Sequence, residues 1–197
     1  MKRTFSVLLL LVGIGLQLFA QETKRLWTLD DIFSPKFSTR SLSAVQWMGE
    51  GKKFSYLEAD TATKQRNLYS YTVADGKREL VMDASQLVSK AGEKPMRIGS
   101  YEWGPDGGNI LVTGTLMARR TKTGGSFGIF NIKTKSFRML SDTSAEQAII
   151  KLSPDGENIG FVRANNLFVM DIASGKETQL TFDGSDNILN GKFDWVY

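Results

Sequence analysis

One short phrase recurs three times along this chain of 197 residues. It consists of an aromatic or apolar residue, a tight turn, an apolar strand, a second strand, and a turn containing Gly and Lys. The clearest copies begin at Trp103 (WGPDGGNILV) and Leu152 (LSPDGENIGFV), and a weaker copy begins at Trp47. Repeats of this size are typical of radial or stacked arrays, in which each unit is stable only beside its neighbours.

Each repeat predicts four short strands. Pro105 and Pro154 fix φ at the second position of a turn, and the Asp and Gly that follow suit its later positions. Aromatic and β-branched stretches predict a third strand in each unit, at 68–73, 127–132 and 167–172. Polar strands follow at 78–80, 137–140 and 178–181. A W-shaped meander of four strands is a propeller blade. We therefore expect an all-β fold, an incomplete β-propeller of about three four-stranded antiparallel blades plus the start of a fourth.

The units differ in length, because the two Pro-Asp-Gly turns lie 49 residues apart and the starts at Trp47 and Trp103 lie 56 apart. The extra residues fall at 83–100, where we expect a short helix around 86–90, and at 117–125, a basic connection that ends in Gly. Insertions between strands usually decorate one rim of such an array and often carry function.

The first 20 residues have the features of a signal peptide. Lys2 and Arg3 precede an apolar stretch at 7–16, and Leu-Phe-Ala precedes Gln21 as a cleavage site. The stretch is short for a membrane span, which favours a signal peptide over the alternative of an uncleaved anchor, and no Cys follows it that could be lipidated. We therefore expect 1–20 to be a signal peptide and 21–197 to be exported, to the periplasm or the cell surface, with no stable membrane span. Beyond it, Thr28 and Asp31 predict a short capped helix at 28–33.

Composition excludes several classes of function. Without Lys2 and Arg3, 23 of the 25 basic residues remain against 21 acidic ones, and both signs are mixed along the chain, which argues against nucleic-acid binding. The chain has no His and no Cys, so we expect no catalytic residue, no zinc site and no cofactor. The Gly-x-Ser-x-Gly pattern at 124–128 precedes an alternating strand instead of the helix that a nucleophile elbow needs. The oxygen-rich stretch 183–187 lacks the spacing of a calcium loop, and we interpret it as a solvated turn.

Two groups of side chains leave alternatives open. Arg119, Arg120 and Lys122 form a basic cluster on the 117–125 connection, which is either a solvated loop or a set of donors aimed at a carbonyl or carboxylate. The tryptophans at 47, 103 and 195 favour a place in the blade core over a ligand platform.

Two stretches resemble a known family. The motif LSPDG at 152–156 followed by NNLFV at 165–169 is similar to a blade of the N-terminal propeller in the dipeptidyl peptidase IV family, of the prolyl oligopeptidase clan of serine peptidases. The stretch GKFDWVY at 191–197 is similar to the family segment that leads into a run of glutamates. The resemblance covers 25–197 and is strongest to the exported form of Bacteroidetes-type bacteria.

The resemblance implies an eight-bladed propeller, truncated here, that caps an α/β-hydrolase domain carrying a Ser-Asp-His triad. The family releases dipeptides from peptide N-termini when Pro or Ala is the second residue, and its glutamates hold the free amine of the substrate. An arginine on an early blade insertion holds the substrate carbonyl. Counting back from the strand at Phe127, Arg120 matches it best, with Arg119 as the alternative.

The glutamates, the remaining blades and the triad are not in these 197 residues, so we expect this chain alone to catalyse nothing. Its role would be to wall the substrate chamber, restrict entry to peptides and supply Arg120. The implied partners are those peptides and the C-terminal hydrolase domain; homodimerisation of the parent stays open. Two alternatives remain: a periplasmic TolB-like propeller that only binds a partner, and a sibling prolyl tripeptidyl peptidase. A stable stand-alone protein of three blades is least favoured, since its apolar faces would be uncovered.

Overall fold

The computed structural model describes residues 26–34, 42–115, 125–142 and 146–193. The chain divides into two compact units, Met1–Ser41 and Leu42–Tyr197. In the first unit, helix α2 (Leu29–Phe33) carries a capping box: the Thr28 side chain accepts from the Asp31 amide, and the Asp31 carboxylate accepts from the Thr28 amide. This confirms the short capped helix. Neither helix in the described ranges is long and apolar enough to cross a membrane.

The second unit consists of three four-stranded antiparallel sheets, each made of strands that are consecutive in the sequence. Sheet 1 contains β1 (Ser43–Met48), β2 (Lys53–Ala59), β3 (Arg66–Thr72) and β4 (Arg78–Met82). Sheet 2 contains β5 (Ile98–Trp103), β6 (Asn109–Gly114), β7 (Phe127–Asn131) and β8 (Ser136–Ser141). Sheet 3 contains β9 (Gln147–Leu152), β10 (Asn158–Arg163), β11 (Asn166–Asp171) and β12 (Glu177–Gln179). The prediction of three four-stranded blades is confirmed.

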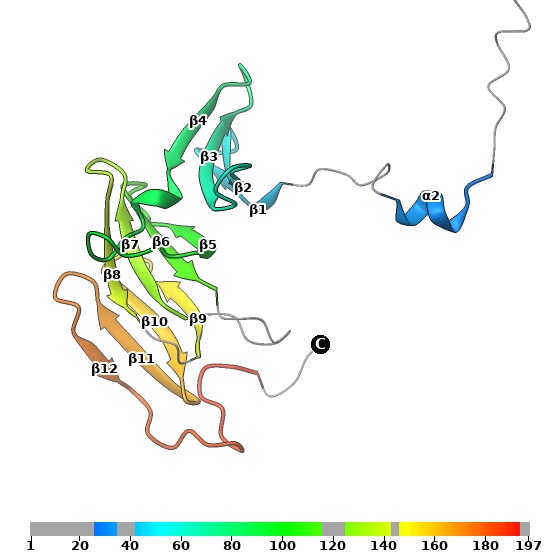
Figure 1. Cartoon of the computed structure of the whole chain (residues 1–197). Coiled ribbons are helices and arrows are strands. Elements are labelled where there is room, and N and C mark those ends of the chain that lie inside the picture. The colour runs from blue at the N-terminus through cyan, green and yellow to red at the C-terminus, as the bar shows by residue number, and fades with distance from the viewer. Residues whose placement is uncertain (1–25, 35–41, 116–124, 143–145, 194–197) are drawn as a thin grey trace, which may run out of the picture. The chain divides into compact units, whose positions relative to one another are not determined.

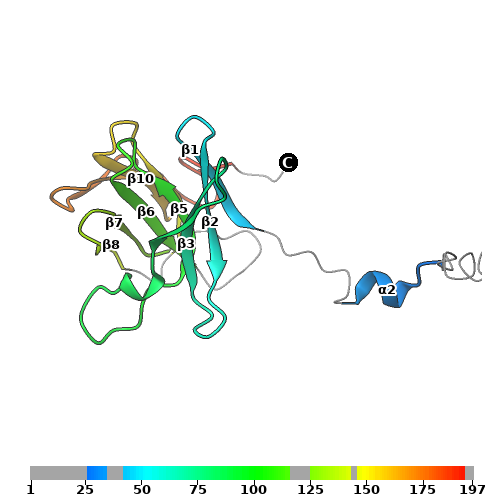
Figure 2. The same ribbon diagram turned by 90° about the horizontal axis from the view of Figure 1, so that it is seen from above.

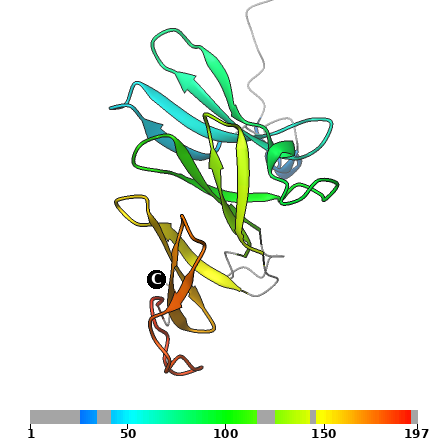
Figure 3. The same ribbon diagram turned by 90° about the vertical axis from the view of Figure 1, so that its left-hand side faces the viewer.

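The sheets lie side by side in chain order, with sheet 2 between the other two (Figure 1, Figure 2 and Figure 3). One apolar core lies between sheets 1 and 2 and includes Leu57, Leu68, Ile110, Val112 and Phe130. A second core lies between sheets 2 and 3 and includes Leu111, Phe127, Ile129, Ile159, Phe161 and Phe168. Because sheet 2 is covered on both faces, β6 after Asn109 and β7 before Asn131 are buried at every position, whereas β11 alternates between buried and partly exposed residues.

The Pro-Asp-Gly turns have the predicted geometry. The Gly107 amide donates to the Gly104 carbonyl at 2.9 Å, and the Gly156 amide donates to the Ser153 carbonyl at 2.9 Å. Both glycines have positive φ, +67° and +75°, which L side chains rarely adopt. A Cβ on Gly156 would also lie 2.8 Å from Pro105 Cδ, so the turn of sheet 3 rests on the turn of sheet 2.

The three sheets have two different ends. At one end, here called the turn rim, short turns join β1 to β2, β3 to β4, and their equivalents in sheets 2 and 3. At the other end, the connection rim, lie the β4–β5 and β6–β7 connections, as expected for insertions that decorate one rim. The helix expected at 86–90 is instead the 3₁₀ turn η2 (Ala84–Gln86), because Asp83 and Gln86 form a capping box that starts it two residues earlier.

Polar side chains also join sheet 1 to sheet 2. The Trp103 indole Nε1 donates to Ser55 Oγ at 2.9 Å, and the Tyr101 hydroxyl donates to the Ala44 carbonyl at 2.7 Å while lying 2.8 Å from Ser55 Oγ. Trp103 thus packs against the core as predicted. The same prediction is wrong for Trp47, which is 66 % exposed, because it lies edge-on to Phe54 on the face of sheet 1 that points away from sheet 2. Trp195 lies outside the described residues.

Candidate functional site

The predicted site residues belong to the β6–β7 connection, whose two described ends lie at the connection rim. Arg120 is the predicted substrate-binding residue, and Arg119 is its alternative. Both fall, with Lys122, in the stretch 116–124 between β6 and β7, which lies outside the described residues. Both ends of this connection are described. Thr115 follows β6 directly, and Gly125 and Ser126 lead into β7. The geometry that the structure adds to the prediction is therefore the anchoring of the end at Gly125 and Ser126.

Gly125 is held by the first residue of sheet 3. Its amide donates to the Gln147 carbonyl at 3.1 Å, and its carbonyl accepts from the Gln147 side-chain Nε2 at 2.9 Å. Gln147 is completely buried, at 0 % exposure. A carboxamide without access to water must find its hydrogen bonds inside the protein, so its partners are fixed by the fold.

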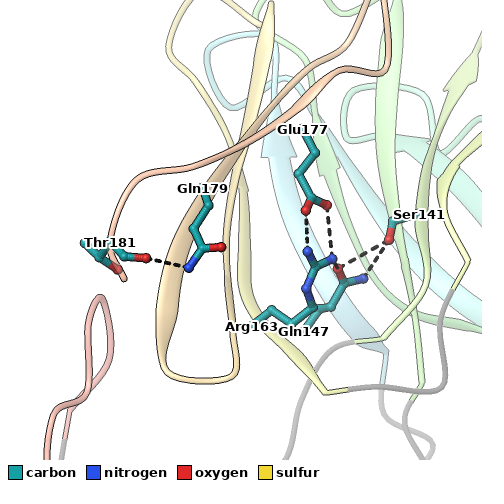
Figure 4. A network of polar contacts seen from close by, with 6 residues as sticks. All are labelled: Ser141, Gln147, Arg163, Glu177, Gln179 and Thr181. Atoms are coloured by element: carbon teal, nitrogen blue, oxygen red, sulfur yellow. Dashed lines mark hydrogen bonds and ion pairs between the residues drawn. The ribbon is translucent and has the colours of Figure 1, made fainter. Parts of the chain in front are cut away.

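The remaining hydrogen bonds of this carboxamide come from two other strands (Figure 4). Nε2 also donates to Ser141 Oγ at 3.0 Å, at the end of β8. Oε1 accepts from Arg163 Nη1 at 3.2 Å, at the end of β10, where Gln147 and Arg163 are paired neighbours. The carboxamide thus links the end of the β6–β7 connection to strands of both sheets.

Arg163 is itself fixed on both sides. Its guanidinium makes a bidentate ion pair with the Glu177 carboxylate on β12, with Nη1 at 3.0 Å from Oε2 and Nη2 paired to Oε1. It also lies 4.4 Å from the ring centroid of Phe168 and 5.5 Å from that of Phe161. The planar fork and the aromatic face hold a guanidinium in one orientation. Figure 4 shows Arg163 pointing toward both Glu177 and Gln147.

The β10–β11 turn next to Arg163 holds a second segment, the chain that follows β12. Asn166 Oδ1 accepts from the Gly184 amide at 2.9 Å and from Thr181 Oγ1 at 3.2 Å. Asn165 donates from Nδ2 to the Ser185 carbonyl at 2.8 Å, and its own carbonyl accepts from the Asn190 amide at 3.1 Å. Residues 181–190 therefore return to the connection rim, where they contact Asn165 and Asn166 of the NNLFV motif.

A shallow pocket of about 160 Å³ opens at the same rim between sheets 1 and 2. Its lining includes three cationic residues, Lys64, Arg66 and Arg97, together with Thr115 at the start of the β6–β7 connection. The Arg66 guanidinium donates to Ser43 Oγ and to the Ile98 carbonyl, at 2.5 and 3.5 Å. This side of the rim is therefore positively charged and offers donors for carbonyl or carboxylate oxygens.

The serine of the Gly-x-Ser-x-Gly pattern has the environment expected of a hairpin end. Ser126 Oγ donates to Asp142 Oδ1 at 3.0 Å, and β7 follows directly instead of a helix. Across the described ranges, no group of three acidic side chains could hold a metal ion. In the stretch 183–187, Asp183 accepts from Asn190 Nδ2 at 3.0 Å, which is consistent with a turn.

Comparison with known proteins agrees with the resemblance noted in the sequence. Residues 104–197 match the family model described as the dipeptidyl peptidase IV N-terminal region. This part of the chain therefore resembles a dipeptidyl peptidase IV N-terminal region. Among curated relatives, it is 28 % identical to the probable dipeptidyl-aminopeptidase B of Chaetomium globosum over 86 % of this chain and 20 % of that protein. It is also 28 % identical to the probable dipeptidyl peptidase 4 of Emericella nidulans, over 90 % of this chain and 22 % of that protein.

The fold agrees with a solved structure of the same family name. The crystal structure of Porphyromonas gingivalis dipeptidyl peptidase 4 superposes with a TM-score of 0.61 at 24 % identity, over 82 % of this chain and 22 % of that one. This chain thus spans about a fifth of the length of the dipeptidyl peptidase relatives it matches. The likeness supports a partial propeller fold for this chain.

The sequence alone did not point to Gln147, Arg163 or Glu177. Their hydrogen bonds join residues 14 to 22 positions apart, and the bond to Gly125 leaves sheet 3, so no local motif marks them. One weak signal was present: Gln147 opens a strand of otherwise apolar inward positions, where a polar residue without a partner would be costly.

Proposed function

We propose that this chain is the N-terminal propeller part of an exported serine dipeptidyl peptidase that releases Xaa-Pro and Xaa-Ala dipeptides from peptide N-termini. The observation that carries the proposal is the match of residues 104–197 to the dipeptidyl peptidase IV N-terminal region. In this proposal, residues 1–20 are a signal peptide, and the triad is supplied by a C-terminal α/β-hydrolase domain of the same protein.

The role proposed for the chain itself is to wall the substrate chamber and to supply a donor for the peptide backbone. Arg120 would donate to a substrate carbonyl, with Arg119 as the alternative. Two features of the connection rim support this role. The connection that carries both arginines ends in a buried anchor at Gly125, and Lys64, Arg66 and Arg97 add positive charge beside its other end at Thr115. Carbonyl and carboxylate oxygens of a peptide suit such donors.

The test is an activity assay on the full-length protein that contains this chain. We expect release of p-nitroaniline from Gly-Pro-p-nitroanilide and Ala-Ala-p-nitroanilide, and none from the N-acetylated forms, because an exopeptidase of this kind needs the free amine. Cleavage of Ala-Ala-Pro-p-nitroanilide in place of these substrates would identify a tripeptidyl peptidase instead. A folded full-length protein that cleaves none of them would contradict the proposal and leave a binding propeller.

A further inference from the structure

We propose that Gln147 is a positioning residue for peptide recognition: its buried carboxamide holds Gly125, where the β6–β7 connection enters β7, and Arg163 fixes the orientation of that carboxamide. The inference rests on the proposed function, in which a residue of the same connection contacts the peptide. It adds three residues that do not touch substrate themselves, Gln147, Arg163 and Glu177.

The orientation of the carboxamide follows from the chemistry of its partners. The Gly125 carbonyl can only accept a hydrogen bond, and the Arg163 guanidinium can only donate one. Nε2 must therefore face Gly125 and Oε1 must face Arg163, as the distances of 2.9 and 3.2 Å show. A carboxamide turned the other way would place Oε1 against the Gly125 carbonyl, two acceptors, and Nε2 against the Arg163 guanidinium, two donors. Arg163 thus acts on Gly125 through Gln147.

Glu177 holds the guanidinium that sets this orientation. The bidentate pair uses one edge of the Arg163 fork and leaves Nη1 shared between Glu177 Oε2 and Gln147 Oε1. Both charged side chains keep only 29 % of their surface exposed. A partly buried pair over two aromatic rings is screened less by salt and water than an exposed one. The guanidinium therefore remains in place for the carboxamide.

Sheet 1 contains a matched ion pair without this link. Arg78 on β4 pairs with Glu58 on β2 at 2.7 Å and lies 3.8 Å from the ring centroid of Tyr69. Here the arginine is on the fourth strand and the carboxylate on the second, which reverses the order found in sheet 3. Exchanging the two charges in either sheet should keep an ion pair, but only the exchange in sheet 3 removes the donor that orients Gln147.

Three variants of the full-length protein test the proposal. Gln147→Glu keeps the size of the side chain and a partner for Arg163, but it places a carboxylate oxygen against the Gly125 carbonyl. The double variant Arg163→Glu with Glu177→Arg keeps an ion pair while a carboxylate at position 163 draws Nε2 away from Gly125. The matched control is Glu58→Arg with Arg78→Glu.

We expect Gln147→Glu and the sheet 3 exchange each to raise KM for Gly-Pro-p-nitroanilide by about tenfold, the effect of one lost hydrogen bond, with kcat changed less than about twofold. Hydrogen exchange, followed by mass spectrometry, should become faster in peptides that cover 125–131. The sheet 1 exchange should leave both measurements as in the wild type. Because a general loss of stability would lower the activity of all three variants together, the difference between the two exchanges identifies positioning.

Three other results would overturn the inference in distinguishable ways. Faster exchange at 125–131 with unchanged KM would show an anchor that recognition does not use, while the peptidase activity of the wild type would still support the proposed function. Unchanged exchange and unchanged KM would show that Gln147 does not hold Gly125. A wild type without dipeptidyl peptidase activity would refute the proposed function, and with it a role in peptide recognition, whatever exchange shows.

Discussion

Arg78 in sheet 1 and Glu177 in sheet 3 occupy the same position of the repeat and carry opposite charges. The strand registers establish the equivalence. Tyr69 on β3 and Phe168 on β11 are equivalent, because each lies opposite an aromatic residue of the second strand. Arg78 lies opposite the residue two positions after Tyr69, and Glu177 lies opposite the residue two positions after Phe168. Their ion-pair partners, Glu58 and Arg163, are equivalent as well. Two repeats thus place an ion pair against an aromatic ring with the charges exchanged.

Sheet 2 fills the same position without any charge. Its residue equivalent to Arg78 and Glu177 is Phe137, opposite Phe130 on β7. The position of Tyr69 and Phe168 is taken by Gly128, and a Cβ there would lie 2.4 Å from the Arg138 carbonyl and 2.6 Å from the Phe137 ring. The Phe137 ring therefore occupies the space that an aromatic side chain on β7 would need. Sheets 1 and 3 thus have an ion pair over an aromatic ring, whereas sheet 2 has an aromatic ring over a glycine.

This arrangement predicts that Gly128→Ala destabilises the protein. The added methyl group would overpack the core against backbone and a ring, at a cost of about 1–3 kcal/mol, seen as a lower midpoint in urea unfolding of the full-length protein. Gly160→Ala on β10 is the control, because a Cβ there meets nothing within 4 Å. A neutral Gly128→Ala would mean that Phe137 can move away.

A second prediction concerns the junction of sheets 1 and 2. Ser55→Ala should destabilise the protein by roughly 1–3 kcal/mol, because the Trp103 indole N–H would lose its acceptor in a partly buried site. Trp103→Phe removes the donor, so Ser55→Ala should cost less in that background. Additive losses in the double-mutant cycle would show that the bond contributes nothing to stability.

The pKa of Tyr101 predicts how this junction responds to alkali. Burial raises the pKa of its hydroxyl above the ordinary value of 10.0, partly opposed by the hydrogen bond with Ser55. A folded-state pKa above the unfolded value contributes stability that is complete below pH 10 and is lost as pH rises through the folded pKa. The unfolding midpoint should therefore fall above pH 10 more steeply in the wild type than in Tyr101→Phe. Equal slopes would contradict a buried, neutral hydroxyl.

Arg120→Ala in the full-length protein should lower kcat/KM for dipeptide substrates by about 10- to 100-fold, since a charge-assisted hydrogen bond contributes roughly 1.5–3 kcal/mol. Its thermal midpoint should stay within about 1 °C, because the role proposed for Arg120 is to bind substrate and not to stabilise the fold. Arg119→Ala, one residue away, is the matched control. If the Arg119 variant loses activity and the Arg120 variant does not, the assignment moves by one residue; if neither does, no arginine of this connection contacts the peptide.

The sequence predicted the parts of the fold that local chemistry determines. The turns at Pro105 and Pro154 depend on three consecutive residues each, and the third strands of sheets 2 and 3 begin and end within one residue of the predicted ranges. The capping box at Thr28 also depends on residues three positions apart. For these elements, the alternation of apolar and polar residues and the residue types of turns and caps are sufficient to predict the structure.

The remaining features depend on which sheet lies next to which. Trp47 has the same aromatic signal as Trp103, yet only Trp103 lies between two sheets, so burial could not be read from residue type. In the sequence, Gln147 is an ordinary polar residue at the start of a strand. Its role depends on Gly125 of the β6–β7 connection and Arg163 of β10, which only the folded structure brings next to it. Arg119 and Arg120 came from the family resemblance and remain a prediction.

The contact between Pro105 and Gly156 bears on how such a protein can be altered. Because each turn there rests on its neighbour, adding one residue to a Pro-Asp-Gly turn would displace two sheets at once. A residue added between β6 and β7 changes a single connection, whose C-terminal residues Gly125 and Ser126 stay bound to Gln147 and Gly114. Grafting a foreign recognition loop or a reporter tag should therefore succeed at the connection rim and fail at the turn rim.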